Sequence, residues 1–203
     1  MTDPMTPQAL RALYGEPSDI ARRKELDALD PHARAFIALS PFVVLASADG
    51  EGRLDATPRG DAPGFVAVLD ERRLLVPDRR GNNRIDTLAN VAVNPRIGMV
   101  FLVPGLNETL RVNGRARITT DAALLEPLAV QGRMPTSALL VEVEEVYFHC
   151  GKAMIRSSLW DPERQVAKGS FPSLGRIVAD QIAGLDAGAA EERIEESYRT
   201  RLY

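Results

Sequence analysis

The chain has 203 residues and a net charge of −3, with 45% hydrophobic and 26% charged residues. This is the composition of a globular domain that is long enough to bury a core. The acidic balance argues against a nucleic-acid partner, because binding to a phosphate backbone needs a basic surface. The single cysteine, Cys150, excludes an internal disulfide, and the two histidines, His32 and His149, lack the spacing of a zinc site.

The first residues, MTDPMTPQAL, lack the charged and then apolar pattern of a secretion signal. No apolar run approaches the length of a membrane span. We therefore expect a cytoplasmic protein with no membrane partner.

Residues 7 to 40 predict three helices. Pro7 opens the first and Ser18 caps the second. Asp30 and Pro31 provide a cap and a first-turn proline for the third, which Pro41 ends. The residues of this third helix that we expect to be buried are Ala33, Phe36, Ile37 and Leu39.

From residue 42 the pattern changes to one typical of β-strands. The predicted strands are 42–48, 53–59, 64–70, 72–78, 97–105, 108–120 and 137–149. The first two are joined by the turn DGEG, which predicts a hairpin. In 108–120 apolar residues alternate with Arg111, Asn113, Arg115 and Arg117, so one face of this strand is expected to be basic and wet.

A helix at about 84–93 is predicted between the second and third strand pairs. We expect Asn83 to cap it, with Asp86 at the third helical position. Its predicted apolar face consists of Ile85, Leu88, Ala89 and Ala92. Further helices are expected at about 151–159 and 173–201, the latter with a break near 184–188.

Antiparallel strands interrupted by helices exclude a doubly wound parallel sheet. They favour a mainly β fold with flanking helices (α+β), namely a closed or nearly closed antiparallel Greek-key barrel. We predict an N-terminal helical segment (1–40), a barrel domain (41–165) and a C-terminal helical tail (166–203) that packs on the barrel or a dimer.

The stretch PDRRGNNRIDTL, residues 77–88, crowds hydrogen-bond donors just before a helix. The unpaired N–H groups and partial positive charge of a helix start suit a phosphate group. An ordinary capped helix on a solvated loop is the alternative interpretation.

Three other segments carry polar groups that suit a ligand. Arg59 and Asp61 lie in a Gly/Pro-rich turn, and Glu108 begins the strand with the basic face. Lys152 and Arg156 are i, i+4 neighbours with no acidic partner in their predicted helix. Together with residues 77–88, these groups suit a phosphorylated aromatic cofactor that lies flat against a barrel wall. Trp160, one turn later, either stacks on such a ligand or fills the core.

Four ordered blocks resemble a known family. PRGDAPGFV, LLVPDRRGNNRIDTLAN…NPRIGMVFLVPG, ETLRVNGRA and FHCGKAMIRSSLWDP are similar to the pyridoxamine 5′-phosphate oxidase-related FMN-binding proteins. More narrowly, they resemble a bacterial subgroup described as FMN-dependent enzymes of unassigned substrate. The resemblance runs from about residue 30 to 165, and it implies an FMN-binding split barrel that forms a homodimer with FMN at the subunit interface.

The resemblance also implies which residues contact the cofactor. These are Arg59, Asp61, Val76, Pro77, Asp78, Asn82, Asn83, Arg84, Glu108, Thr109, Lys152 and Arg156. Asn83 and Arg84 stand where the oxidases have an Arg-Lys phosphate clamp, so one charge is missing, and Arg79, Arg80 or Lys152 can offset it. Lys152 and Arg156 would come from the other subunit.

The C-terminal residues depart from the family pattern. True pyridoxamine phosphate oxidases end with Trp and Arg residues for the substrate's phosphate, whereas this chain ends in EERIEESYRTRLY. The resemblance therefore supports FMN binding more than vitamin B6 oxidation. We expect a flavin-dependent oxidoreductase with an unidentified small-molecule substrate and no assigned catalytic residue. The alternatives are a non-catalytic flavin-binding module and a barrel that binds F420; haem is disfavoured because only two histidines could ligate iron.

Overall fold

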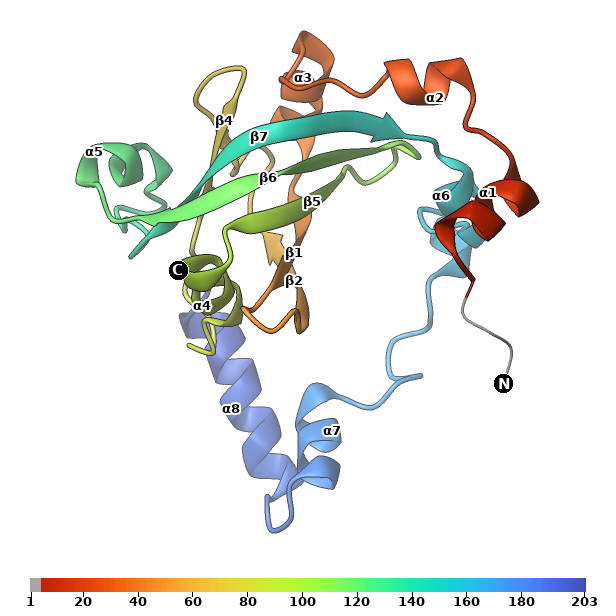
Figure 1. Ribbon diagram of the computed structural model, residues 1–203. Coiled ribbons are helices and arrows are strands. Elements are labelled where there is room, and N and C mark those ends of the chain that lie inside the picture. Colours follow the sequence, from red (N-terminus) through yellow and green to blue (C-terminus); the bar gives the residue numbers. More distant parts are fainter. Residues whose placement is uncertain (1–4) are drawn as a thin grey trace.

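The computed structural model describes residues 5–203 (Figure 1). Residues 1–4 of the predicted segment 1–40 lie outside the described residues. The helices are α1 (Pro7–Tyr14), α2 (Asp19–Arg23), α3 (Pro31–Leu39), α4 (Asp86–Val93), α5 (Ala122–Leu125), α6 (Lys152–Ser157), α7 (Leu174–Gln181) and α8 (Ala187–Thr200). The strands are β1 (Phe42–Ala48), β2 (Leu54–Gly60), β3 (Ala67–Val68), β4 (Arg73–Pro77), β5 (Arg96–Leu102), β6 (Thr109–Thr119) and β7 (Ala138–His149).

The strands form one seven-stranded sheet in the order β2-β1-β5-β6-β7-β4-β3, and the paired neighbours are antiparallel. The prediction of an antiparallel α+β fold is confirmed. The predicted strand 64–70 was too long, since only Ala67 and Val68 pair. The reason is Gly64, whose φ of 81° turns the chain and whose missing Cβ leaves room for the main-chain oxygen of Ala38 in α3.

The sheet curls because its two longest strands, β6 and β7, are bent by a bulge between Asn113 and Gly114. The main-chain oxygen of Glu142 lies so close to Gly114 that no Cβ would fit. The β6–β7 ladder runs from the pair Thr109–His149 to the pair Thr119–Ala138. At ~3.3 Å per residue, these two ends lie about 30 Å apart.

One face of the curled sheet shares a hydrophobic core with α3. Ala33, Phe36 and Ile37 of α3 are buried, as predicted, but Leu39 is 57% exposed, so that prediction was wrong. The inward positions of α3 repeat at i, i+3, i+4 and i+7. The last of these is Ser40, which is 1% exposed, and Leu39 therefore faces solvent.

A second, smaller core lies under α5, a helix that was not predicted from the sequence. It consists of Leu75, Leu125, Leu128, Ala138 and Leu140. The Asp121 side chain caps α5 by accepting a hydrogen bond from the Ala123 N–H. The expected alternation along β6 fails at this end, where Ile118 is 39% exposed and Thr119 is buried.

Helix α4 differs from its prediction at both its start and its buried face. It begins at Asp86, and its cap is Ile85 with a left-handed φ of 53°, so Asn83 is not the cap. The buried residues are Thr87 and Val91, whereas Ile85, Ala89 and Ala92 are exposed. Hydrogen bonds explain this orientation, because Thr87 donates to Asp55 on β2 (3.0 Å) and Asn90 donates to Ser47 on β1 (3.0 Å).

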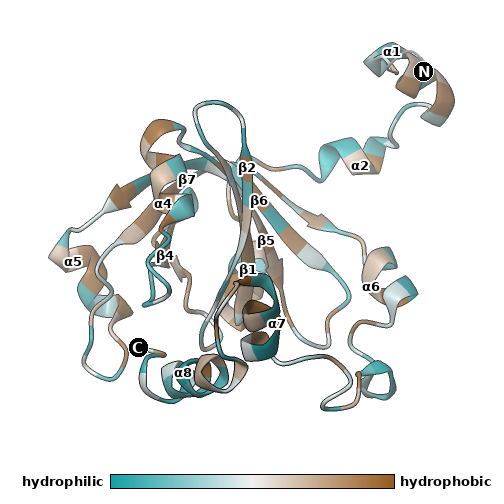
Figure 2. Ribbon diagram, turned by 90° about the horizontal axis from the view of Figure 1, so that it is seen from below, coloured by the Kyte–Doolittle hydropathy of each residue, from teal (hydrophilic) through white to brown (hydrophobic). Residues whose placement is uncertain are grey.

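The terminal helices lie outside the sheet, with α7 and α8 below it in Figure 1 and with α1 and α2 to one side in Figure 2. Neither α1 nor α2 contains a buried residue, and α7 and α8 form a hairpin in which only Gly175 and Ala190 are buried. The prediction of a helical tail with a break near 184–188 is confirmed. Among the helices of residues 5–203, none is long and apolar enough to span a membrane.

Candidate functional site

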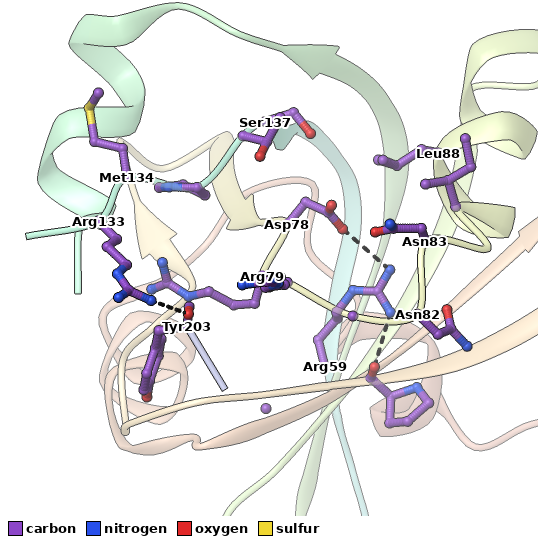
Figure 3. Close-up of a pocket in the computed structure, with 17 residues that line it drawn as sticks. Arg59, Asp78, Arg79, Asn82, Asn83, Leu88, Arg133, Met134, Ser137 and Tyr203 are labelled. Carbon is purple, nitrogen blue, oxygen red and sulfur yellow. Dashed lines mark hydrogen bonds and ion pairs between the residues drawn. The ribbon is translucent and has the colours of Figure 1, made fainter. Parts of the chain in front are cut away.

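A cavity of about 880 Å³ lies where four segments meet (Figure 3). Its walls are residues 58–60 of β2, residues 78–83 after β4, residues 133–137 before β7, and Tyr203 after α8. Ile85 and Leu88 add an apolar part of the wall. The volume is within the range of about 300–1,000 Å³ that is usual for sites of small organic ligands.

The charges of the cavity wall are mainly positive. Arg59, Arg79, Arg80 and Arg133 line it, whereas Asp78 is its single acidic residue. Arginine presents several N–H donors in a fixed fork that matches phosphate and carboxylate oxygens. The wall therefore suits an anionic ligand.

Arg79 is held in a buried ion pair beneath the cavity. Its Nε donates to Asp61 Oδ2 at 2.7 Å, and its Nη1 donates to the Leu128 main-chain oxygen at 2.7 Å. The Arg79 and Asp61 side chains are only 15% and 3% exposed. Burial acts to raise the pKa of Asp61, but hydrogen bonds from Tyr203, the Ala62 N–H and Arg79 outweigh it and hold that pKa below its usual value.

Arg59, which also lines the cavity, is loosely held. Its guanidinium donates to Thr57 Oγ1 and to the Pro58 main-chain oxygen, both at 3.1 Å. It lies 3.8 Å from Asp78 Oδ1, which is an ion pair without a hydrogen bond. Burial raises the pKa of Asp78, and the nearby Arg59 only moderates this shift. Arg59 therefore keeps donor capacity for a ligand.

The loop before α4 contains two left-handed residues, Asn83 (φ 60°) and Ile85. Asn82 Oδ1 accepts from the Arg84 N–H at 3.1 Å, which fixes the turn. Arg84 itself is 73% exposed on its side chain, and its Nε donates to Asp86 Oδ2 at 2.8 Å. It stands at the rim and is not one of the residues that line the cavity.

The structure brings together only some of the predicted cofactor contacts. Arg59, Asp78, Asn82 and Asn83 line the cavity, with Asp61 directly behind them. Val76 and Pro77 are buried in β4, where they pair with Leu139 and Ala138 of β7. The Asp78 N–H is also unavailable to a ligand, because it donates a hydrogen bond to the Ser137 main-chain oxygen at 3.0 Å.

The remaining predicted contacts lie at the opposite end of the β6–β7 ladder, about 30 Å away. Thr109 begins β6 there, directly after Glu108, and is 8% exposed. Lys152 and Arg156 are exposed on α6, with no acidic side chain paired to them in the described part of the chain. Trp160 Nε1 donates to the Leu106 oxygen at 2.8 Å, which ties this segment to the loop before β6.

Two parts of the wall were missed from the sequence. Arg133, Met134 and Ser137 belong to the connection that follows α5. The sequence does contain a signal for α5, namely the Asp121 cap and the spacing of Leu124, Leu125 and Leu128. This signal also predicts a connection between α5 and the last strand. Tyr203 carries no local signal, since its hydroxyl bonds to a residue 142 positions away.

The family model described as pyridoxamine 5′-phosphate oxidase matches residues 29–150, more than half of the chain. The chain belongs to this family, and the predicted antiparallel split-barrel fold class is confirmed. The matched region contains all of β1 to β7, and it contains the cavity wall apart from Tyr203.

Solved structures show weaker likeness. HupZ of Group A Streptococcus is 20% identical with a TM-score of 0.49, over 59% of this chain and 93% of its own. A Clostridium acetobutylicum protein related to general stress protein 26 of B. subtilis (pyridoxinephosphate oxidase family) is 13% identical, with a TM-score of 0.45 over 59% and 86%. An F420 reductase is 15% identical, with a TM-score of 0.43 over 60% and 98%. No curated protein sequence matches the chain.

A metal-dependent site is not indicated by the described residues. Within residues 5–203, no group of three or more His, Cys, Asp or Glu side chains is arranged to hold a metal ion. The arginines and amides of the cavity wall suit an organic anion instead.

Proposed function

We propose that the protein binds FMN in this cavity and is a flavin-dependent oxidoreductase that acts on an unidentified small molecule. The observation that supports this most is the donor set of the wall, with four arginines, two asparagines and one acidic residue, in the region that matches the family. Arginine and amide N–H groups suit the phosphate of FMN, and Ile85 and Leu88 suit its apolar ring system.

The arginines of the wall have different roles in this proposal. Arg79 is already neutralised by Asp61, so it shapes the site more than it binds an anion. Arg59 and Arg80 keep donors for the phosphate, together with the amides of Asn82 and Asn83. Arg84 joins them when its side chain leaves Asp86.

FMN, when bound, supplies hydride and electron transfer through its isoalloxazine ring. The chain's own residues bind and orient it. Arg59 is only 23% exposed on its side chain, so it places a cation in a partly desolvated position. A cation in such a position attracts the phosphate of FMN more strongly than one in bulk water would.

We also propose a homodimer with the cavity at the subunit interface. The outer face of β1 and β5 supports this, because it exposes Phe42 and carries the half-buried pair Val44–Val100. A partner would cover these apolar residues. A partner would also bring the other end of its β6–β7 ladder to the cavity, including Lys152 and Arg156.

The visible spectrum of the freshly purified protein, with mass analysis of what heat releases, tests the proposal. Released FMN, followed by bleaching of its absorption band by NADH or NADPH, is the expected result. Release of F420 instead of FMN would mean that the cofactor of the protein is F420. A colourless protein that fails to take up added FMN would overturn it, and bound FMN that no reductant bleaches would indicate a flavin-binding module.

A second experiment concerns the loop. Arg84→Ala should weaken FMN binding several-fold, because it removes a cation that reaches the phosphate from the rim. Titration of the apoprotein with FMN, followed by flavin fluorescence, measures this. Full FMN affinity in the variant would show that Arg84 remains with Asp86 and is no phosphate ligand.

A further inference from the structure

In the described part of the chain, one residue, Tyr203, connects the C-terminal hairpin of α7 and α8 to the barrel by hydrogen bonds. Its helices pack on each other, with Gly175 against Glu191. Among the described residues, the hydrogen bonds that join segment 166–203 to the rest of the chain are those of Tyr203. The hairpin is therefore positioned by a residue that also forms part of the cavity wall.

Tyr203 is fixed by three contacts that come from separate parts of the chain. Its hydroxyl donates to Asp61 Oδ1 at 2.7 Å, and its main-chain oxygen accepts from Arg133 Nη1 at 2.7 Å. Its ring lies 5.9 Å from the Arg79 guanidinium carbon. Asp61 is thus shared between the buried Arg79 and Tyr203, which links the floor of the cavity to its C-terminal wall.

We propose that residues 201–203 form a strap that closes one end of the cavity, and that ligand binding and docking of the α7–α8 hairpin stabilise each other. The ligand in this proposal is FMN, so it rests on the proposed function. When the strap is docked, the Tyr203 ring contacts the bound ligand and shields that end of the ligand from water. Because coupling between two binding events is reciprocal, the ligand must hold the strap as strongly as the strap holds the ligand.

This coupling differs from a purely structural role of Tyr203. A structural anchor would hold the hairpin equally with and without ligand. If the strap contacts the ligand, the protection of the hairpin amides from hydrogen exchange depends on whether the cavity holds the ligand. Ligand affinity then also depends on a residue that follows α8. Both quantities can be measured on the intact protein.

The experiment combines hydrogen exchange of α7–α8 amides with FMN titration. Three variants are compared with the wild type. Tyr203→Ala removes the ring and hydroxyl, Tyr203→Phe removes only the hydroxyl bond to Asp61, and Tyr198→Ala on α8 is the matched control, since Tyr198 is 59% exposed.

We expect Tyr203→Ala to speed exchange in α7–α8 without FMN and to weaken FMN binding about five-fold or more. Tyr203→Phe should show a smaller change in the same direction, and Tyr198→Ala none. FMN should slow exchange in the wild-type hairpin and have little effect in Tyr203→Ala.

Three outcomes would overturn the proposal that residues 201–203 form a strap. These are unchanged hairpin exchange in Tyr203→Ala without FMN, wild-type FMN affinity in that variant, and faster hairpin exchange when FMN binds. A wild type that fails to bind FMN would contradict the proposed function instead. The exchange comparison made without FMN would still decide whether Tyr203 holds the hairpin.

Discussion

The two ends of the β6–β7 ladder hold their cations in different ways. At the cavity end, Arg79 is buried and bonded to Asp61, and Arg59 lies within 3.8 Å of Asp78. At the other end, Lys152 and Arg156 are exposed on a short helix. The first end is organised by the chain itself, whereas the second offers cations that another molecule can reach.

This difference follows from the cost of burying charge. A buried cation needs a partner, because an uncompensated charge in the interior costs several kcal/mol. Exposed cations remain hydrated and contribute little to the stability of the monomer. In the proposed dimer, the cavity end is therefore the half-site that each chain forms by itself, and the α6 end is the half-site that serves the cavity of a second copy.

The largest expected effect is on the buried pair. Asp61→Ala leaves Arg79 buried without its counter-ion and should lower the free energy of unfolding by about 3–5 kcal/mol. Chemical denaturation measures this. The control is Asp180→Ala, which breaks the exposed Arg176–Asp180 pair and should cost less than about 1 kcal/mol. Equal effects of the two variants would contradict the difference between buried and exposed pairs.

The same pair predicts a pH dependence. The pKa of Asp61 is lower in the folded chain than its usual value. Its contribution to stability is therefore present above the usual pKa, ~4, and is lost as the pH falls through the lower folded value. Asp61→Asn should be less stable than the wild type at neutral pH, and the gap should narrow in acid. A gap that stays constant down to the acid transition would exclude this linkage.

The next effect is on ligand affinity. Arg59→Ala removes a half-buried cation of the cavity and should weaken FMN binding roughly 10- to 100-fold, the range of a hydrogen bond to a charged group. Arg176→Ala, far along the C-terminal hairpin, is the control and should bind normally. Fluorescence titration of the apoproteins gives both values. If the Arg59→Ala protein bound FMN with wild-type affinity, this cavity would not be the FMN site.

Mixing variants tests whether the two ends meet across a dimer. A Lys152→Ala/Arg156→Ala double variant and the Arg59→Ala variant should each bind FMN weakly. After unfolding and refolding together, random pairing restores one intact site in each mixed dimer, which is about a quarter of all sites. No recovery of tight binding in the mixture would show that Lys152 and Arg156 do not serve a partner's cavity.

The smallest effect concerns backbone strain beside the cavity. A left-handed β-branched residue such as Ile85 costs about 1–2 kcal/mol, so Ile85→Gly should stabilise the protein by up to about 1 kcal/mol despite the added freedom of the unfolded chain. Ile20→Gly in α2, at another exposed isoleucine, should instead destabilise that helix. Thermal unfolding compares the two variants. Destabilisation by Ile85→Gly would mean that the Ile85 side chain contributes more than its backbone costs.

Sequence patterns were sufficient for the elements that depend on local signals. The cap at Asp30 and the spacing of Ala33, Phe36 and Ile37 predicted α3, and alternation predicted most strands. They failed at α4, since the left-handed Ile85 and the bonds of Thr87 and Asn90 to other strands decide where the helix starts and which face it buries.

The candidate site was predictable only in part for the same reason. The donors of residues 77–88 are contiguous, so their density was visible in the sequence. The roles of Asp61, Arg133 and Tyr203 depend on contacts between distant segments, and the Tyr203–Asp61 bond spans 142 positions. No local pattern encodes such contacts.

A crystal structure of the protein with FMN tests the central proposal most directly. We expect flavin density in the cavity between β2 and the loop before α4. The phosphate should lie within hydrogen-bond distance of Arg59, Arg80 or the Asn82–Asn83 amides, and α6 of a partner should lie beside it. Flavin density elsewhere on the barrel, with this cavity open to solvent, would contradict the proposal that this cavity binds FMN.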